Sequence, residues 1–215
     1  MGVFNLTLYL LISMENYAGI VIAFITGVIG PILVLYIKNK LDKKEKPDMV
    51  KETLRVAELI TNKIEHIKEE FHADRVWVTQ FHNGGNFYPT GKSMAKFSVM
   101  YETVNPGVGS IQTNFHNIPV NLFSKSINQL LNNDSIEISD FKDETIPTFG
   151  LKYIAEDTNC KSGYLFAIKT IDDKFIGTLG LDYTKRKTKL DIEAINHLQL
   201  HAASIGGVLM THLEQ

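Results

Sequence analysis

CKSGYLFAIKTIDDKFIGTLGLDY, residues 160–183, gives the clearest structural signal in the chain. Its two runs of apolar, aromatic and β-branched residues, 163–170 and 174–183, are separated only by Ile171-Asp172-Asp173. Two such runs with a short connection are typical of antiparallel strands joined by a tight turn. The stretch therefore predicts a β-hairpin, and other strands are expected to extend the same sheet.

Three further strands are predicted before the hairpin. They are RVWVTQF (75–81), KFSVMYETV (96–104) and SIEISDF (135–141), which combine apolar positions with β-branched and aromatic residues. The segment HNGGN (82–86) is rich in Asn and Gly and predicts a turn or loop after the first of them. Residues 142–160 predict a loop with a short helix at 153–157.

Two long helices and one short helix complete the pattern. Apolar residues recur at steps of three and four over 49–71 and again over 189–213, which is the spacing of an amphipathic helix. A shorter helix is predicted over 119–131, with Pro119 at its start. Strands that follow one another without a regular βαβ repeat favour an α+β domain with an antiparallel sheet and flanking helices. The first and last helices are expected side by side on one face.

The order of elements and the local sequence resemble the GAF family of sensory domains. The matching segments are ADRVWVTQF (73–81), IPVNLFSKSINQLLNNDSIEISD (118–140), the hairpin block 160–183 with its Ile-Gly-x-Leu core, and LDIEAINHLQLHAASIGGVL (190–209). The related PAS-like fold is the alternative. The resemblance implies a GAF/PAS-like sensory module with a ligand pocket, and it covers most of residues 48–215.

Three departures prevent a ligand from being carried over from the family. The Asn-Lys-Phe-Asp-Glu signature of the cyclic-nucleotide subgroup is missing. Bilin-binding members commonly have His after the attachment Cys, whereas Lys161 follows Cys160 here. Members that reduce methionine sulfoxide need several cysteines, and this chain has one. The cofactor or ligand therefore stays unknown at this stage.

Residues 16–37 (NYAGIVIAFITGVIGPILVLYI) form an uncharged run of 22 residues near the N-terminus. As a helix they would extend about 33 Å, enough for a hydrocarbon core of roughly 30 Å. The sequence predicts a single transmembrane helix over 16–37 within an apolar segment 1–37, followed by a lysine-rich tether at 38–47 and a GAF-like domain at 48–215. A buried core helix is the alternative.

The flanks of this segment predict its orientation. Lysines crowd the tether after the span, and no Lys or Arg precedes it. The positive-inside rule therefore predicts a single-pass membrane protein with its domain on the cytoplasmic side. The tether lysines could also meet anionic lipid headgroups.

Composition excludes several functions. The net charge of −2 gives no sign of nucleic-acid binding. A single cysteine excludes an intramolecular disulfide and a cysteine-cluster metal site. No phosphate-binding P-loop, HExxH or nucleophile-elbow motif occurs, and we expect the chain not to be an enzyme.

The candidate ligand-binding residues centre on the Gly-rich segment after the first strand. Glycines there would let the backbone approach a ligand, and a second Phe-His-Asn triplet occurs at 115–117. Ser162 opens a strand in the block that resembles the family. The predicted site residues are Gln80, His82, Asn83, Gly84, His116 and Ser162. An ordinary turn with a partly exposed His82 is the alternative, and an anion or metal between His82 and His116 is a weaker one.

Other residues with reactive side chains have simpler explanations. His197 and His201 are spaced i, i+4 on the last helix, as in many metal sites, but they also fit a solvated helix edge. Cys160 could be a redox-sensitive thiol activated by Lys161, or a plain partly buried cysteine. Lys185-Arg186-Lys187 is a basic turn that is expected to be solvated.

Two functions remain open. One is a membrane-anchored sensory module that binds a small molecule between the sheet and residues 105–160. It would signal to an unidentified effector protein or through a homo-oligomer formed by helices 16–37, 49–71 and 189–213. The other is a ligand-free, membrane-tethered interaction or assembly protein with the same fold.

Overall fold

The computed structural model of the protein describes residues 19, 22–42, 48–87 and 89–213. The chain divides into two compact units, Met1–Asp48 and Met49–Gln215, each of which is considered separately. The beginning of the predicted span, at 16–18 and 20–21, and residues 43–47 of the predicted tether lie outside the described residues.

The first unit contains an apolar helix. A π-helical turn, η1 (Ile25–Ile29), leads into α2 (Gly30–Asp42). The π-helical turn ends just before Pro31, which has no N–H to donate to a preceding carbonyl. The stretch Ile22–Lys40 has a mean hydropathy of 1.7, is long enough to cross a membrane, and is not buried against protein. A helix of this kind is typical of a membrane anchor or a signal sequence. It extends to Asp42, into the predicted tether.

The second unit is built on one six-stranded sheet of order β3-β2-β1-β6-β5-β4. Every neighbouring pair of strands is antiparallel. In chain order the elements are α3 (Met49–Glu70), β1 (Arg75–Asn86), β2 (Ser93–Val104), β3 (Ile118–Pro119), η2 (Val120–Phe123), α4 (Ser124–Asn133), β4 (Ser135–Ile138), α5 (Lys152–Asp157), β5 (Ser162–Lys169), β6 (Phe175–Tyr183) and α6 (Ile192–Leu213). The predicted α+β class with an antiparallel sheet is confirmed.

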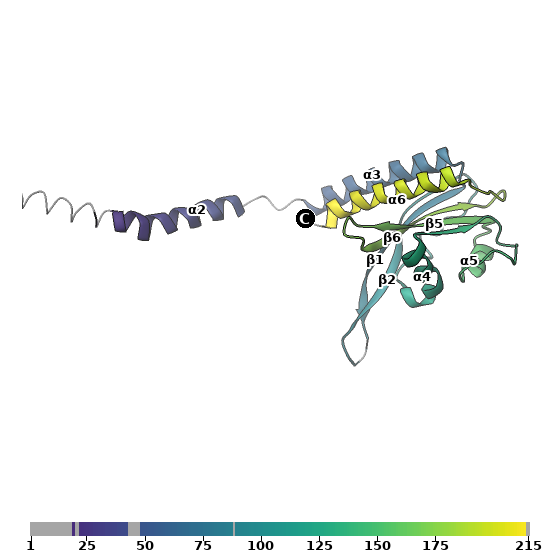
Figure 1. The fold of residues 1–215 in the computed structure, drawn as a ribbon, viewed down its shortest axis with the longest axis horizontal. Helices are drawn as coiled ribbons and strands as arrows, with labels where there is room; N and C mark the ends of the chain where they lie inside the picture. The colour runs from purple at the N-terminus through teal and green to yellow at the C-terminus, as the bar shows by residue number, and fades with distance from the viewer. Residues whose placement is uncertain (1–18, 20–21, 43–47, 88, 214–215) are drawn as a thin grey trace, which may run out of the picture. The chain divides into compact units, whose positions relative to one another are not determined.

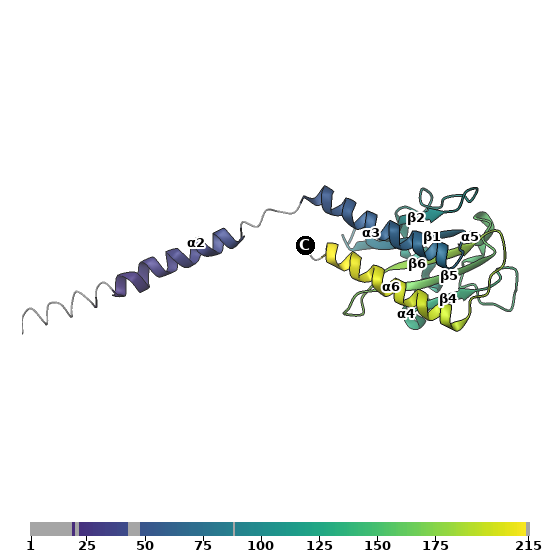
Figure 2. The same cartoon turned by 90° about the horizontal axis from the view of Figure 1, so that it is seen from above.

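Helices cover both faces of the sheet, and they do so differently (Figure 1). α3 and α6 lie side by side on one face, as predicted, while α4 and α5 lie over the other (Figures 1 and 2). The main core lies under the two long helices. Its fully buried residues include Ile60, Ile64, Ile67, Val76, Val78, Phe166, Ile168, Leu179, Leu181, Leu198, Ile205 and Leu209.

The turn predicted at 82–86 was wrong. β1 continues to Asn86 and pairs with β2 from Ser93 onward, with His82 opposite Lys96. Gly84 and Gly85 fall in a register irregularity between Asn83 and Asn86, and Gly85 has a φ of +100°. The two glycines therefore form a bulge within a long ribbon. The chain reverses later, where Phe87 N–H donates to Lys92 O.

Other boundaries shifted for local reasons. The last helix starts at Ile192 instead of 189, because the Asp191 carboxylate accepts a hydrogen bond from Ala194 N–H and caps it. The predicted helix 119–131 is a short 3₁₀ turn followed by α4. The strand predicted at 135–141 ends at Ile138.

The close contact between α6 and β5 yields a test with adjacent glycines. A Cβ at Gly206 would lie 2.5 Å from the carbonyl oxygen of Lys169, whereas a Cβ at Gly207 would meet nothing within 4 Å. We expect Gly206→Ala to force the helix off the sheet and destabilise the domain by roughly 1–3 kcal/mol, as in overpacked cores. Gly207→Ala should stabilise by up to about 1 kcal/mol, because alanine is the better helix former. Urea unfolding followed by circular dichroism measures the free energy of unfolding of both variants. Equal changes in the two variants would contradict the close contact at Gly206.

Candidate ligand pocket

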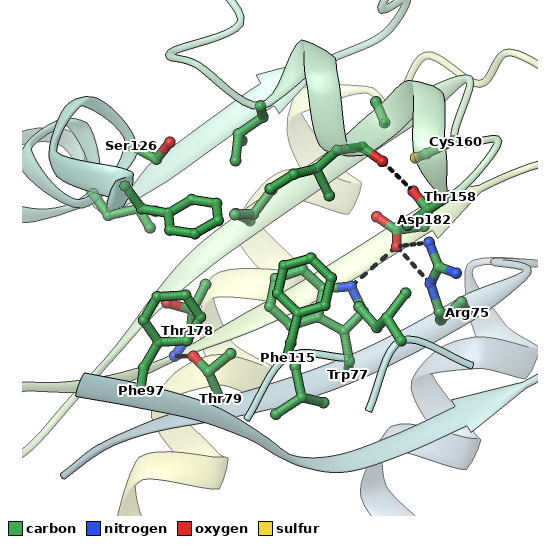
Figure 3. A pocket seen from close by; sticks show the side chains of 18 of the residues that line it. Arg75, Trp77, Thr79, Phe97, Phe115, Ser126, Thr158, Cys160, Thr178 and Asp182 are labelled. Carbon is green, nitrogen blue, oxygen red and sulfur yellow. Dashed lines mark hydrogen bonds and ion pairs between the residues drawn. The ribbon is translucent and has the colours of Figure 1, made fainter. Parts of the chain in front are cut away.

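A cavity of about 90 Å³ lies on the face of the sheet opposite α3 and α6. Its other wall comes from the segment that carries α4 and α5, between Ile111 and Cys160. This is the space between the sheet and residues 105–160 in which the sequence analysis placed a ligand. Figure 3 shows the side chains that converge on it. Most of them are apolar: Trp77, Phe81, Phe97, Val99, Ile111, Phe115, Phe123, Ile127, Leu130, Phe141, Leu151, Ile154, Ala155 and Leu165.

β1 supplies one wall through the alternation of a strand. Arg75, Trp77, Thr79 and Phe81 line the cavity, because every second residue of a strand points to the same face. The indole of Trp77 lies against β6 at Gly180, its cross-strand partner. A Cβ at Gly180 would come within 2.1 Å of that ring. The glycine therefore leaves the room that the indole occupies.

One end of the cavity holds a buried ion pair. Asp182 Oδ2 accepts hydrogen bonds from Arg75 Nε at 2.7 Å and from Trp77 Nε1 at 3.1 Å, and it lies 2.6 Å from Arg75 Nη2. Arg75 Nη1 donates to the carbonyl of Gly109. The arginine is 1% exposed, so its charge is balanced almost entirely by this one carboxylate. Figure 3 shows the pair beside Trp77.

Three other polar side chains of the wall already have protein partners. The Thr79 hydroxyl accepts a hydrogen bond from Thr178 N–H, Ser126 donates to Phe149 O, and Thr158 donates to Ile154 O. These bonds already use part of the small hydrogen-bonding capacity of a wall that is mostly apolar. The cavity therefore suits an apolar or aromatic molecule that is recognised mainly by shape.

Cys160 is the remaining chemically reactive group of the wall. It is buried and its Sγ donates to Ser162 O at 3.0 Å. Burial raises the pKa of the Cys160 thiol well above its usual range, and the carboxylate of Asp182 raises it further. The thiol stays protonated and is a poor nucleophile. The structure thus agrees with a plain buried cysteine.

The residues predicted for the site lie apart from the cavity. Gln80 and His82 point to the opposite face of β1, because they alternate with Thr79 and Phe81. His82 Nε2 lies 2.9 Å from Ser98 Oγ, which also accepts a hydrogen bond from Asn117 N–H.

Asn83 and His116 are exposed, and the side chain of Lys96 occupies the space next to Gly84. Ser162 is fully buried; its hydroxyl donates to Ser139 O and accepts from Thr188 N–H. The structure thus brings Gln80, His82 and Gly84 to one strand face and leaves the others separate. Ligand binding by these six residues stays a prediction.

The sequence reasoning missed the cavity's own polar residues. Arg75 and Asp182 are single charges inside two apolar strands, and such charges are rarely buried unless they are paired. A single charge within an apolar strand was therefore the sequence signal that could have identified Arg75 and Asp182. The apolar alternation of β1, by contrast, marks both faces as buried and does not tell which face lines a pocket.

The comparisons with known proteins agree on the fold. No protein-family model and no curated protein matches the chain in sequence. The blue-light-absorbing PixJ GAF domain of Thermosynechococcus elongatus matches in structure with a TM-score of 0.59 at 14% identity, over 80% of this chain and 94% of that one. The phycocyanobilin-bound GAF domain of a cyanobacterial phytochrome gives 0.59 at 15%, over 78% and 94%. A far-red cyanobacteriochrome photoreceptor gives 0.58 at 12%, over 85% and 98%.

The unit Met49–Gln215 therefore has a GAF-like fold. The resemblance inferred from residues 73–81, 118–140, 160–183 and 190–209 is confirmed as a likeness of fold. Of the two folds left open by the sequence, the structure has the GAF-like one. Identities this low carry the fold alone, so the ligand must be argued from the cavity of this chain.

Removing the negative charge of the buried pair should be costly. We expect Asp182→Asn to destabilise the domain by about 3–5 kcal/mol, because Arg75 would keep a buried charge without a counter-charge. The double variant Arg75→Met with Asp182→Leu should recover most of this loss, since apolar replacements of a buried pair are often tolerated. Denaturant unfolding of both variants, with Asp172→Asn on the exposed hairpin turn as control, measures the difference. If Asp182→Asn lowered the free energy of unfolding no more than Asp172→Asn does, the ion pair would not be needed for stability.

Proposed function

We propose that this protein is a membrane-anchored sensory module whose GAF-like domain binds a small, largely apolar molecule and signals through a partner or an oligomer. The observation that carries the proposal is the apolar cavity between the sheet and the segment that bears α4 and α5. It lies between elements of different layers, where a guest contacts the central strands and the covering helices together. We do not assign the module a catalytic step.

The size of the cavity argues for a ligand no larger than about one ring. A single water needs about 10–15 Å³ of such space, and an engineered apolar cavity of about 150 Å³ binds benzene. The cavity here is about 90 Å³. Solved GAF domains of similar fold are described as phycocyanobilin-bound and phycoerythrobilin-bound. A linear tetrapyrrole is far larger than this space, and Cys160 is a poor nucleophile for attaching one, so a different ligand class is favoured.

The route from ligand to output runs through the sheet. β1 and β6 carry cavity residues on one face and core residues under α3 and α6 on the other. A change in strand spacing around a ligand would therefore reach both long helices. Leu54 and Leu59 of α3, with Ile192 and Leu200 of α6, are large apolar side chains that remain exposed. They support the proposal that segments 49–71 and 189–213, with 16–37, mediate a homo-oligomer or contact an effector.

Membrane anchoring and orientation are part of the proposal. The apolar helix Ile22–Lys40 supports an anchor by length and composition. The lysines that follow it, and the lack of Lys and Arg before it, support a cytoplasmic domain. The alternative function is a ligand-free tethered interaction module, which the exposed apolar residues of α3 and α6 would also serve.

Filling the cavity tests the ligand function. Small aromatic and apolar metabolites would be screened on the full chain in detergent, with the fluorescence of Trp77, the only tryptophan, as the reporter of the cavity. A ligand at 100 times its Kd should stabilise the fold by about 2.7 kcal/mol. We expect Ala155→Met, on the cavity wall, to weaken its binding at least tenfold.

Ala203→Met, on the exposed side of α6, is the matched control and should bind normally. The sensor proposal would be rejected if no compound stabilises the wild-type chain. Equal binding by Ala155→Met and the control would place the ligand outside the cavity.

Orientation is tested by protease protection in cells that express the full chain. Protease added outside intact cells should leave the domain uncleaved, and it should digest the domain once the membrane is permeabilised. A variant with the tether lysines 38, 40, 43, 44 and 46 changed to glutamine should lose its preferred orientation in the membrane, because cytoplasmic positive charge fixes orientation. Digestion of the unaltered chain in intact cells would show that the domain faces outward.

A further inference from the structure

The facing edges of α3 and α6 bring three histidines around one glutamate. His66 and Glu70 are spaced i, i+4 on α3, and His197 and His201 are spaced i, i+4 on α6. The spacing puts each pair on one face of its helix. The helices lie side by side (Figure 2), and Lys63 Nζ donates to Ser204 Oγ one turn away at 2.9 Å. The chain separation between Glu70 and His201 is 131 residues, so only the fold assembles the cluster.

Glu70 is the centre of the group. Its Oε2 lies 3.3 Å from His66 Nδ1 and 3.2 Å from His201 Nε2, and its Oε1 lies 2.9 Å from His197 Nδ1. The ligating atoms of His66, Glu70 and His201 all fall within 4.8 Å of one another. Two ligand atoms of a tetrahedral zinc ion are about 3.3 Å apart when the bonds are about 2.0–2.1 Å. Two of the three distances between ligating atoms, from Glu70 to His66 and from Glu70 to His201, already have this value.

The cluster is accessible and partly held in place. The Phe71 ring forms T-shaped contacts with the rings of His197 and His201, with centroid distances of 5.9 and 6.0 Å. The His201 side chain is 20% exposed, so it is fixed by packing, while that of His66 is 71% exposed and free to turn inward. The ligand atoms of the third pair, His66 and His201, lie within 4.8 Å of each other, so binding one ion would require the exposed His66 ring to turn toward His201.

We propose that His66, Glu70 and His201 bind a divalent zinc-class ion that links the last turns of α3 to the first half of α6. His197 is a positioning residue, whose Nδ1 lies 2.9 Å from the second oxygen of Glu70 and holds it by an ion-pair contact. Water takes the fourth position of the ion. This site is separate from the cavity, because it lies on the layer of α3 and α6 and shares no residue with the cavity wall.

The donor set selects the class of metal. Imidazole nitrogens with one carboxylate suit zinc and its first-row neighbours. Magnesium and calcium prefer all-oxygen sites with more carboxylates, and they are expected to bind poorly here. Because the ion joins two helices, binding to the folded chain stabilises it, whereas the unfolded chain cannot assemble the same ligands.

The test uses the full chain in detergent after treatment with a chelator. Zn²⁺ at 100 times its Kd should raise the midpoint of thermal unfolding by roughly 5–10 °C, while Mg²⁺ and Ca²⁺ should not. Competition with a chromogenic zinc chelator should give one ion per chain. Co²⁺ in place of zinc should show the visible absorption of tetrahedral coordination.

Matched variants separate the site from general histidine binding. His66→Gln and His201→Gln should each weaken zinc at least tenfold and remove the thermal shift. His197→Gln should weaken it less, as expected for a residue that orients a ligand. His116→Gln, an exposed histidine outside the helices, should behave as wild type. His66 is exposed, so its variant should keep the wild-type midpoint without metal and remain informative.

Two results would overturn the proposal. One is the absence of any zinc-dependent shift in the wild-type chain. The other is an equal shift in His66→Gln, His201→Gln and the His116→Gln control, which would mean scattered surface binding. Neither result bears on the cavity, whose ligand is tested without metal.

Discussion

The ion pair between Arg75 and Asp182 ties together the two central strands. The two residues face each other across β1 and β6, so their hydrogen bonds form only in one register. A shift of one residue would turn every side chain of a strand to the other face. It would put Trp77 and Phe81 under the long helices and Val76 and Val78 into the cavity. A buried pair is weak evidence for net stability, but it is well suited to fixing such a register.

This register gives the sheet two faces with different tasks. Under α3 and α6 most of the buried side chains are aliphatic, joined by the rings of Tyr164, Phe166 and Tyr183, and Gly206 brings α6 close to the backbone of β5. On the opposite face, aromatic rings and a polar end enclose open space. Close-packed aliphatic layers transmit displacement, and large rings leave voids when they cannot interdigitate. The fold therefore places its adaptable volume on one side of the sheet and its rigid layer on the other.

The sequence correctly predicted the strands and helices that depend on a local, periodic pattern of residues. The hairpin of β5 and β6 and the helices α3 and α6 are periodic over many residues, and they were placed within a few positions. The segment 82–86 was misassigned because Asn and Gly mark a bulge as readily as a turn. Arg75, Trp77 and Asp182 were missed as site residues because strand periodicity cannot tell which of two buried faces is hollow. His197 and His201 were noticed, but their acidic partner Glu70 comes from the other end of the domain.

The polar edge between α3 and α6 bears on whether the two helices can move. The buried apolar residues of α3 begin at Val56, so the helices are held to the sheet by the core along most of their length. Among the residues that the structure describes, polar contacts between the two helices include the Lys63–Ser204 bond and the contacts of Glu70 with His197 and His201. Exposed bonds of this kind are individually weak, about 1 kcal/mol or less. The buried apolar cluster that both helices share thus fixes each helix on the sheet, and the polar contacts along the edge between α3 and α6 add weakly to it on the solvent side.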